Sequence, residues 1–370
     1  MLGYSHGAKS VKRIHASFLA MAVLVFLGGF YLWFRAAMRV ADLPAPAIRM
    51  KAGVQTQAQG GPRNSGAACF DPNRNIEVPC PVLDPLVEAA QQNDVQGVER
   101  LLARRHDINT LNKALFAVAE SAGLFMEAET RKEVKQDEAH GFHCARIAKL
   151  LLENGASVEA REQDGRTPLI AAAGYGEDDV VKLPRDRGAD IEAVDDGGQT
   201  ALIAASCNCP IVDMADTSDS VRALLEKGAN IEARDKRGRT ALMTAAAWGL
   251  EGQVRLLLDW GASIDATDSH GNTALLIAAS GSAYPTADAA EALLRRGADI
   301  EARNDNGDTA LILAASGGGS EDVRVVRLLL DRGADLHARN RQGYTALELA
   351  RKNGRRETAA LAGAAMAKSR

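Results

Sequence analysis

The chain has 370 residues, which is enough for two or three ordinary domains or for one elongated repeat domain. Charged residues make up 25% and hydrophobic residues 46%, a balance that excludes disorder throughout the chain. Aromatic residues are only 4%, which argues against a sandwich or barrel and favours helices packed through alanine and leucine. The net charge of -4 gives no sign of nucleic-acid binding.

The N-terminal segment has the character of a membrane anchor. A basic tail, residues 1–15, precedes residues 16–34, which contain no charge and would span roughly 28 Å as a helix. This stretch is longer than the apolar part of most cleaved signal peptides, so it predicts an uncleaved signal anchor. A cleaved signal peptide and a soluble core helix are the alternatives.

The orientation of this anchor is nearly balanced, because basic residues lie on both sides of residues 16–34. We expect the N-terminus inside and the body in the periplasm of a Gram-negative envelope, with inner-membrane lipid around the helix. A body facing the cytoplasm is the alternative. The next segment favours export: residues 35–83 are rich in proline and glycine, which predicts a linker, and Cys69 and Cys80 could close a disulfide loop there. Two unrelated thiols are the other interpretation.

Two sequence markers recur in step from residue 84 onward. The first is a Gly-Ala-x-Ile-Glu-Ala pattern, and the second is a Gly-x-Thr pattern ahead of an Ala/Leu run. The first begins at Gly155, Gly188, Gly228, Gly261, Gly297 and Gly333, and the second places Thr167, Thr200, Thr240, Thr273, Thr309 and Thr345. Both markers have the same spacings, 33, 40, 33, 36 and 36 residues, so chance is an unlikely cause.

Each marker has a physical reason. A threonine before an Ala/Leu run is an N-cap, because its hydroxyl accepts a free amide of the first helical turn. Pro168 suits the first helical position, where no amide bond is lost. A second apolar run follows each short helix, and glycine then closes it because glycine adopts the left-handed conformation cheaply. The sequence therefore predicts pairs of antiparallel helices joined by turns.

This pattern resembles the ankyrin repeat, over residues 84–364, with a short C-terminal tail at 365–370. The resemblance implies an all-α repeat solenoid of about eight helix-turn-helix units. The transmembrane helix expected at 16–34 would precede this solenoid. The N-terminal units are expected at 86–102 and 113–152. The chain departs from the family at the usual histidine position, which holds Ile170, Ile203, Met243, Leu276, Ile312 and Glu348.

Insertions of different length fall between the two helices of several units. They are expected at about 123–144, 207–219, 281–287 and 317–320, and would line one rim of the stack as a binding edge or as tolerated surface loops. Two of these insertions contain thiols or imidazoles that could bind metal, although no familiar zinc spacing is present: His140, His143, Cys144, Cys207 and Cys209. Pro184 predicts a truncated or kinked outer helix in the third unit.

The turns between units hold the most variable charges. In the ankyrin family such turns and the inner-helix surface form the concave recognition face, so the resemblance implies a protein partner at these positions. The candidate residues are Arg161, Asp196, Arg234, Lys236, Arg237, His270, Asp305, Arg339, Arg341 and Tyr344. Most of them could equally be solvated turn residues. Trp248 and Trp260 are candidate binding anchors, with burial between units as the alternative.

Catalytic sequence patterns are absent: the chain has no Gly-x-Ser-x-Gly, no phosphate-binding loop, no His-Glu-x-x-His and no dinucleotide fingerprint. We expect no enzyme, no cofactor and no nucleic-acid partner. The leading interpretation is a membrane-tethered scaffold that binds a protein through the concave face. An immunity or inhibitor protein that neutralises a toxic effector in the envelope is one alternative, and a metal- or redox-binding envelope protein is another.

Overall fold

The computed structural model divides the chain into two units, residues 1–82 and 83–370. The residues that it describes are 68–71, 76–79, 83–120, 137–176, 181, 187–207, 217–280, 284–317 and 319–368. The expected anchor at 16–34 lies outside them. Among the described residues, no helix combines the length and the apolar character that a membrane span requires.

The first unit contains a short antiparallel hairpin. Strand β1 (Ala68–Asp71) pairs with β2 (Ile76–Pro79), and Cys69 lies opposite Val78. The hairpin lies within residues 35–83, which the sequence predicts to be a linker, and the linker stays a prediction. A four-residue strand gives too short a pattern to be recognised by alternation. Cys80 lies outside the described residues, so the Cys69–Cys80 disulfide stays a prediction.

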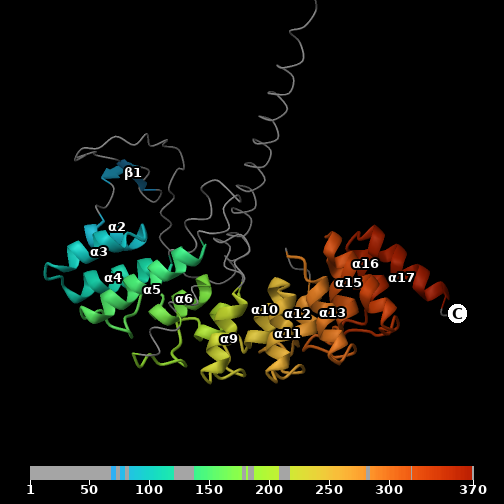
Figure 1. Ribbon diagram of the computed structural model, residues 1–370. Helices are drawn as coiled ribbons and strands as arrows, with labels where there is room; N and C mark the ends of the chain where they lie inside the picture. Colours follow the sequence, from blue (N-terminus) through green and yellow to red (C-terminus); the bar gives the residue numbers. More distant parts are fainter. Residues whose placement is uncertain are drawn as a thin grey trace, which may run out of the picture. The chain divides into compact units, whose positions relative to one another are not determined.

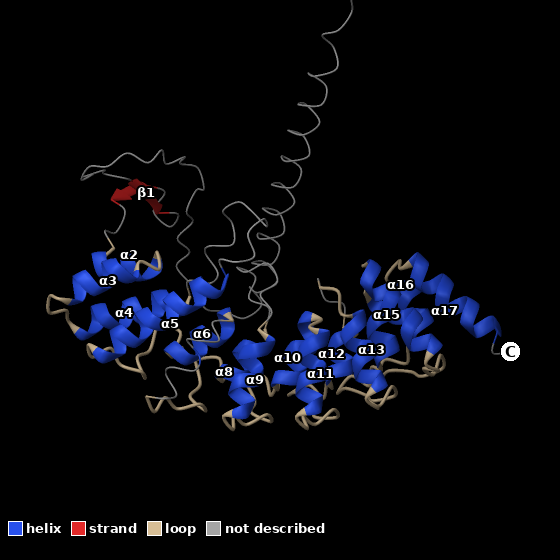
Figure 2. Cartoon of the chain, viewed as in Figure 1, coloured by secondary structure: helices blue, strands red, loops and turns tan. Residues whose placement is uncertain are grey.

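The second unit consists of helix pairs in chain order (Figures 1 and 2). The inner helices are α2 (Pro85–Gln91), α4 (Ile108–Ala119), α6 (Pro168–Tyr175), α8 (Ala201–Ala205), α10 (Ala241–Trp248), α12 (Ala274–Ala278), α14 (Ala310–Ser316) and α16 (Ala346–Lys352). The outer helices are α3 (Val95–Leu102), α5 (Asp137–Glu153), α9 (Ser218–Glu226), α11 (Glu251–Asp259), α13 (Ala287–Arg295), α15 (Ser320–Asp331) and α17 (Arg356–Lys368). The outer segment that follows α6, including Pro184, lies outside the description except for Val181, so the predicted kink is untested.

Stacking follows the order of the sequence. Each inner helix contacts the next inner helix from α2 to α16, and the outer helices from α9 to α17 contact one another in the same order. The buried side chains form one continuous apolar core from Leu86 to Ala350. Because each pair buries its apolar side against its neighbours, the fold is the α repeat solenoid that the sequence predicted.

Threonine caps begin the inner helices as predicted. The Thr240 hydroxyl accepts the amide of Met243 at 3.4 Å, and Thr167, Thr200, Thr273, Thr309 and Thr345 do the same with the amide three residues later. Pro168 occupies the first position of α6. Glycine ends the outer segments with positive φ angles, such as +88° at Gly261. The two recurring markers are therefore the two ends of the same repeated helix pair.

Candidate functional site

Six turns between units, called tips here, carry most of the candidate residues. They span residues 161–166, 194–199, 234–239, 267–272, 303–308 and 339–344. In the third, the Asp235 carboxylate accepts the backbone amides of Arg237 and Arg239, both at 2.8 Å. The same double acceptor recurs at Asp195, Asp268, Asn304 and Asn340. A short side chain that bonds its own backbone favours a tight turn, so this residue fixes each of these five tips.

Neighbouring tips are joined to one another by backbone hydrogen bonds. The amide of Lys236 donates to the carbonyl of Gly197 at 2.9 Å, and the amide of Ser269 donates to the carbonyl of Arg237 at 2.9 Å. Equivalent 2.9 Å bonds run from Asp196 to Asp164, from Asp305 to His270 and from Arg341 to Asn306. The six tips thus form one continuous edge whose geometry is set before any partner binds.

Three arginines reinforce this edge. Arg234 Nη1 donates to the Gly238 carbonyl at 2.8 Å and to the Thr267 carbonyl of the next unit at 2.6 Å. Arg161 and Arg303 make the same two bonds in their own units. Two predicted partner-binding residues, Arg161 and Arg234, therefore also hold neighbouring tips together. Arginine suits this task because its planar group offers several donors at once.

The structure brings the remaining candidates to the same edge. Asp196, Lys236, Arg237, Asp305 and Arg341 are exposed. Among the described residues, His270 Nδ1 lies 3.2 Å from the hydroxyl of Ser269, and Arg339 pairs with Glu348 at 2.9 Å. Tyr344 is half-buried beneath the ammonium group of Lys352, which lies 4.2 Å from the ring centroid. Whether these residues bind a partner stays a prediction.

The inner helices add an apolar strip that the sequence analysis did not single out. The residue four positions after each capping threonine is small and buried in the first units, as at Ala171 and Ala204, and is larger and only half-buried in the last three. Those three residues are Ile277, Leu313 and Leu349. The recurring position after each threonine, read for residue size, is the signal that could have found this strip.

A half-buried charge cluster lies at the first tip. Arg166 pairs with Glu120 at 3.0 Å, with Glu162 at 2.8 Å and with Asp164 at 2.7 Å. Burial raises the pKa of Glu120, and burial together with the charge of Glu120 raises the pKa of Glu162. Desolvation thus exceeds the attraction of Arg166 at both glutamates, because one guanidinium serves three carboxylates.

We expect Glu162→Gln to stabilise the protein at pH 7 and to have little effect near pH 4. A carboxylate with a raised folded-state pKa favours folding below its unfolded value, 4.5, and loses that contribution as the pH rises through the folded value. Glutamine stays neutral and keeps a hydrogen-bonding group for Arg166. Thermal unfolding at both pH values measures the effect. Destabilisation that is larger at pH 7 than near pH 4 would show that the ion pair with Arg166 outweighs desolvation.

The structure places three of the candidate metal ligands on α5. His140, His143 and Cys144 were expected in a long loop, but all three lie within the helix, and Cys144 is fully buried in the core. The assignment of residues 137–144 to the insertion was wrong, because no cap residue in the sequence marks the start of α5. Cys207 is half-buried and Cys209 lies outside the description. No group of three or more potential metal ligands occurs among the described residues.

The described part of the insertion expected at 281–287 packs on the preceding unit. The rings of Tyr284 and Trp248 lie 4.3 Å apart between centroids at an angle of 46°, so Trp248 contacts the neighbouring unit. Thr286 closes the insertion by donating its hydroxyl to the Ala278 carbonyl at 2.7 Å. Trp260 is 44% exposed and is thus the freer of the two tryptophans. At this insertion, the rim is therefore partly fixed by packing against the preceding unit.

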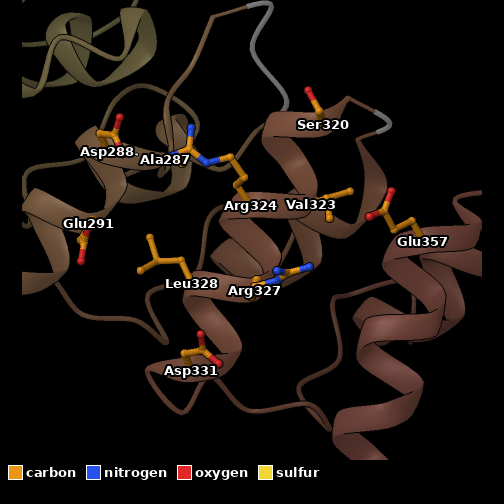
Figure 3. A pocket seen from close by; sticks show the side chains of 10 residues that line it. All are labelled: Ala287, Asp288, Glu291, Ser320, Val323, Arg324, Arg327, Leu328, Asp331 and Glu357. Atoms are coloured by element: carbon orange, nitrogen blue, oxygen red, sulfur yellow. Dashed lines mark hydrogen bonds and ion pairs between the residues drawn. The ribbon is translucent and has the colours of Figure 1, made fainter.

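A separate groove of about 490 Å³ lies on the outer helices (Figure 3). Val323 and Leu328 line it together with Asp288 and Arg324, which pair at 3.0 Å. All of its lining residues belong to α13, α15 or α17, so the groove does not include the tips or the inner helices. Its lining combines charged side chains of both signs with the apolar Val323 and Leu328, and it does not indicate one class of ligand.

These features define a class: a solenoid of stacked helix pairs that presents an edge of variable turns and the face of its inner helices. The family described as Ankyrin repeats (3 copies) matches residues 139–235, 211–304 and 282–363. These matches cover more than half of the chain, so the chain belongs to the ankyrin-repeat family, as the sequence markers indicated. No curated protein matches it. Ankyrin repeats generally mediate protein–protein interaction.

Proposed function

We propose that the protein is an interaction scaffold that binds a protein partner along the tips and the inner-helix strip Ile277, Leu313 and Leu349. The observation that supports this most is the hydrogen-bonded edge, which joins six tips of differing charge through 2.9 Å backbone contacts. A surface that is already ordered loses little conformational entropy on binding. The half-buried apolar strip would supply the hydrophobic contact that the charged tips lack.

Photocrosslinking in cells tests this proposal. A photoreactive phenylalanine analogue replaces Leu313 on α14, and a matched variant carries it at Arg327, which is exposed on the outer helix α15 of the same unit. We expect a discrete protein adduct from position 313 and none from position 327. Equal adducts from both positions, or none from position 313, would contradict binding at the inner face.

We also propose that residues 16–34 tether the scaffold to the inner membrane with the repeats in the periplasm. The length and lack of charge of this segment support the tether, and the two cysteines at 69 and 80, which could close a disulfide loop, support export. Alkaline phosphatase and a cytosolic fluorescent reporter, each fused after Arg370, test the orientation. Phosphatase activity without fluorescence is expected, and the reverse result would place the repeats in the cytoplasm.

A further inference from the structure

The third tip, residues 234–239, differs in charge from the others. It contains four cations and one carboxylate, a net charge of +3. The tips on either side are negative: residues 194–199 carry -2 and residues 267–272 carry -1, with His270 taken as neutral. The first tip is neutral, the fifth carries -1 and the sixth carries +2. The edge therefore has a positive centre flanked by acidic tips.

The single carboxylate of the third tip is already engaged. Asp235 is buried, with its side chain only 4% exposed, and it accepts two backbone amides and the Nε of Arg239 at 3.2 Å. Its one ion pair among the described residues is with Arg239, so it does not pair directly with the other cations of the tip. The Arg234 guanidinium is held by two carbonyls, which leave its charge in place.

Lys236 and Arg237 are the unsatisfied cations of this tip. Both are exposed, and neither side chain has an ion pair or hydrogen bond within the part of the chain that the structure describes. Their backbones are fixed on both sides, by the 2.9 Å bond from Lys236 to Gly197 and the 2.9 Å bond from Ser269 to Arg237. Two cations are thus held at a set place on the edge, and neither has an ion-pair partner among the described residues.

The flanking acids restrict what can bind there. Adjacent tips are in direct backbone contact, so Asp196 and Asp268 lie well within a Debye length, about 10 Å at 0.1 M salt, of the third tip. A long polyanion such as a nucleic acid would be attracted at the third tip and repelled at both neighbouring tips. A short acidic stretch with basic residues on either side would be attracted at all three tips.

We propose that the third tip seats a short acidic segment of the protein partner, with Lys236 and Arg237 as its charge contacts and the flanking acidic tips selecting basic residues beside it. This proposal rests on the proposed function and specifies the chemistry of the partner. It also explains why two exposed cations stand next to each other in a unit whose neighbours are acidic.

Fluorescence anisotropy with the full-length protein in mild detergent tests the proposal. The probes are a labelled peptide with consecutive glutamates between lysines, a peptide of the same composition with the charges alternating, and a single-stranded oligodeoxynucleotide of similar length. We expect the block peptide to bind most tightly. The double variant Lys236→Glu/Arg237→Glu should weaken it on the order of tenfold, since two exposed attractions become repulsions.

Arg327→Glu, on the exposed side of the outer helix α15 and away from the tips, is the matched control and should leave the affinity of the block peptide within about twofold. Unchanged thermal unfolding of the double variant would show that it is folded. Tighter binding of the oligodeoxynucleotide, or binding of the block peptide that the double variant does not weaken, would overturn the proposal. If the crosslink from position 313 persists in the double variant, the proposal of an acidic segment is wrong while the scaffold function stands. Loss of that crosslink supports the proposal.

Discussion

Gly249→Ala is expected to lower the free energy of unfolding by about 3–5 kcal/mol. Gly249 ends α10 with φ +73° and ψ 20°, in the left-handed region. A methyl group there would overlap the backbone carbonyl of Pro285 and approach Thr286 Cα to 3.3 Å. Both contacts are backbone atoms at the end of the insertion before α13, so relief requires that this backbone segment of the next unit shifts. Chemical denaturation followed by circular dichroism measures the loss.

Gly261→Ala is the matched control for this substitution. Gly261 has a similar φ, +88°, but no atom lies within 4 Å of the position that a methyl group would take. It should therefore cost only the backbone strain of a left-handed alanine, about 1–2 kcal/mol. Equal losses for the two variants would show that the contact with Pro285 does not hold the units together.

Asp235→Ala is expected to destabilise the protein by about 3 kcal/mol. The buried carboxylate closes its tip through the amides of Arg237 and Arg239, both at 2.8 Å, and it also pairs with the Arg239 side chain. Alanine would leave these donors without an acceptor in a place with little access to water. Thermal and chemical unfolding report the change.

Asp235→Asn separates the turn from the ion pair. Asparagine already closes the turn at Asn304 and Asn340, where its Oδ1 accepts the same two amides. This variant should keep both turn bonds and lose only the pair with Arg239, so a cost of about 1 kcal/mol is expected. A cost as large as that of alanine would show that the charge, and not the turn, stabilises the tip.

Local signals in the sequence were sufficient to predict the helix pairs. Thr240 and Gly261 mark an inner helix start and an outer helix end because N-capping and the left-handed conformation depend on a few consecutive residues. The start of α5 had no such signal: its first residues are polar, and no capping residue precedes them in register. Cys144 was accordingly expected in a loop and lies in the core.

The sequence could name the tip residues but not their partners. Arg234 was identified as a charge on a turn, whereas its bond to Thr267 joins residues 33 positions apart. Whether Lys236 and Arg237 form ion pairs likewise depends on which carboxylates lie nearby. Among the described residues, Asp235 is engaged by Arg239 and by the backbone. Contacts of this kind exist only once neighbouring units stack.

By itself the sequence determined the family, the boundaries of most helix pairs and the edge on which the variable charges lie. Each of these follows from a period of 33 to 40 residues and from capping chemistry that acts within one helical turn. Only the tertiary structure decided that Arg161 and Arg234 bridge neighbouring tips and that the insertion at Tyr284 packs on Trp248. The physical reason is that these contacts join separate units, and their geometry is fixed by the stacking of whole helices.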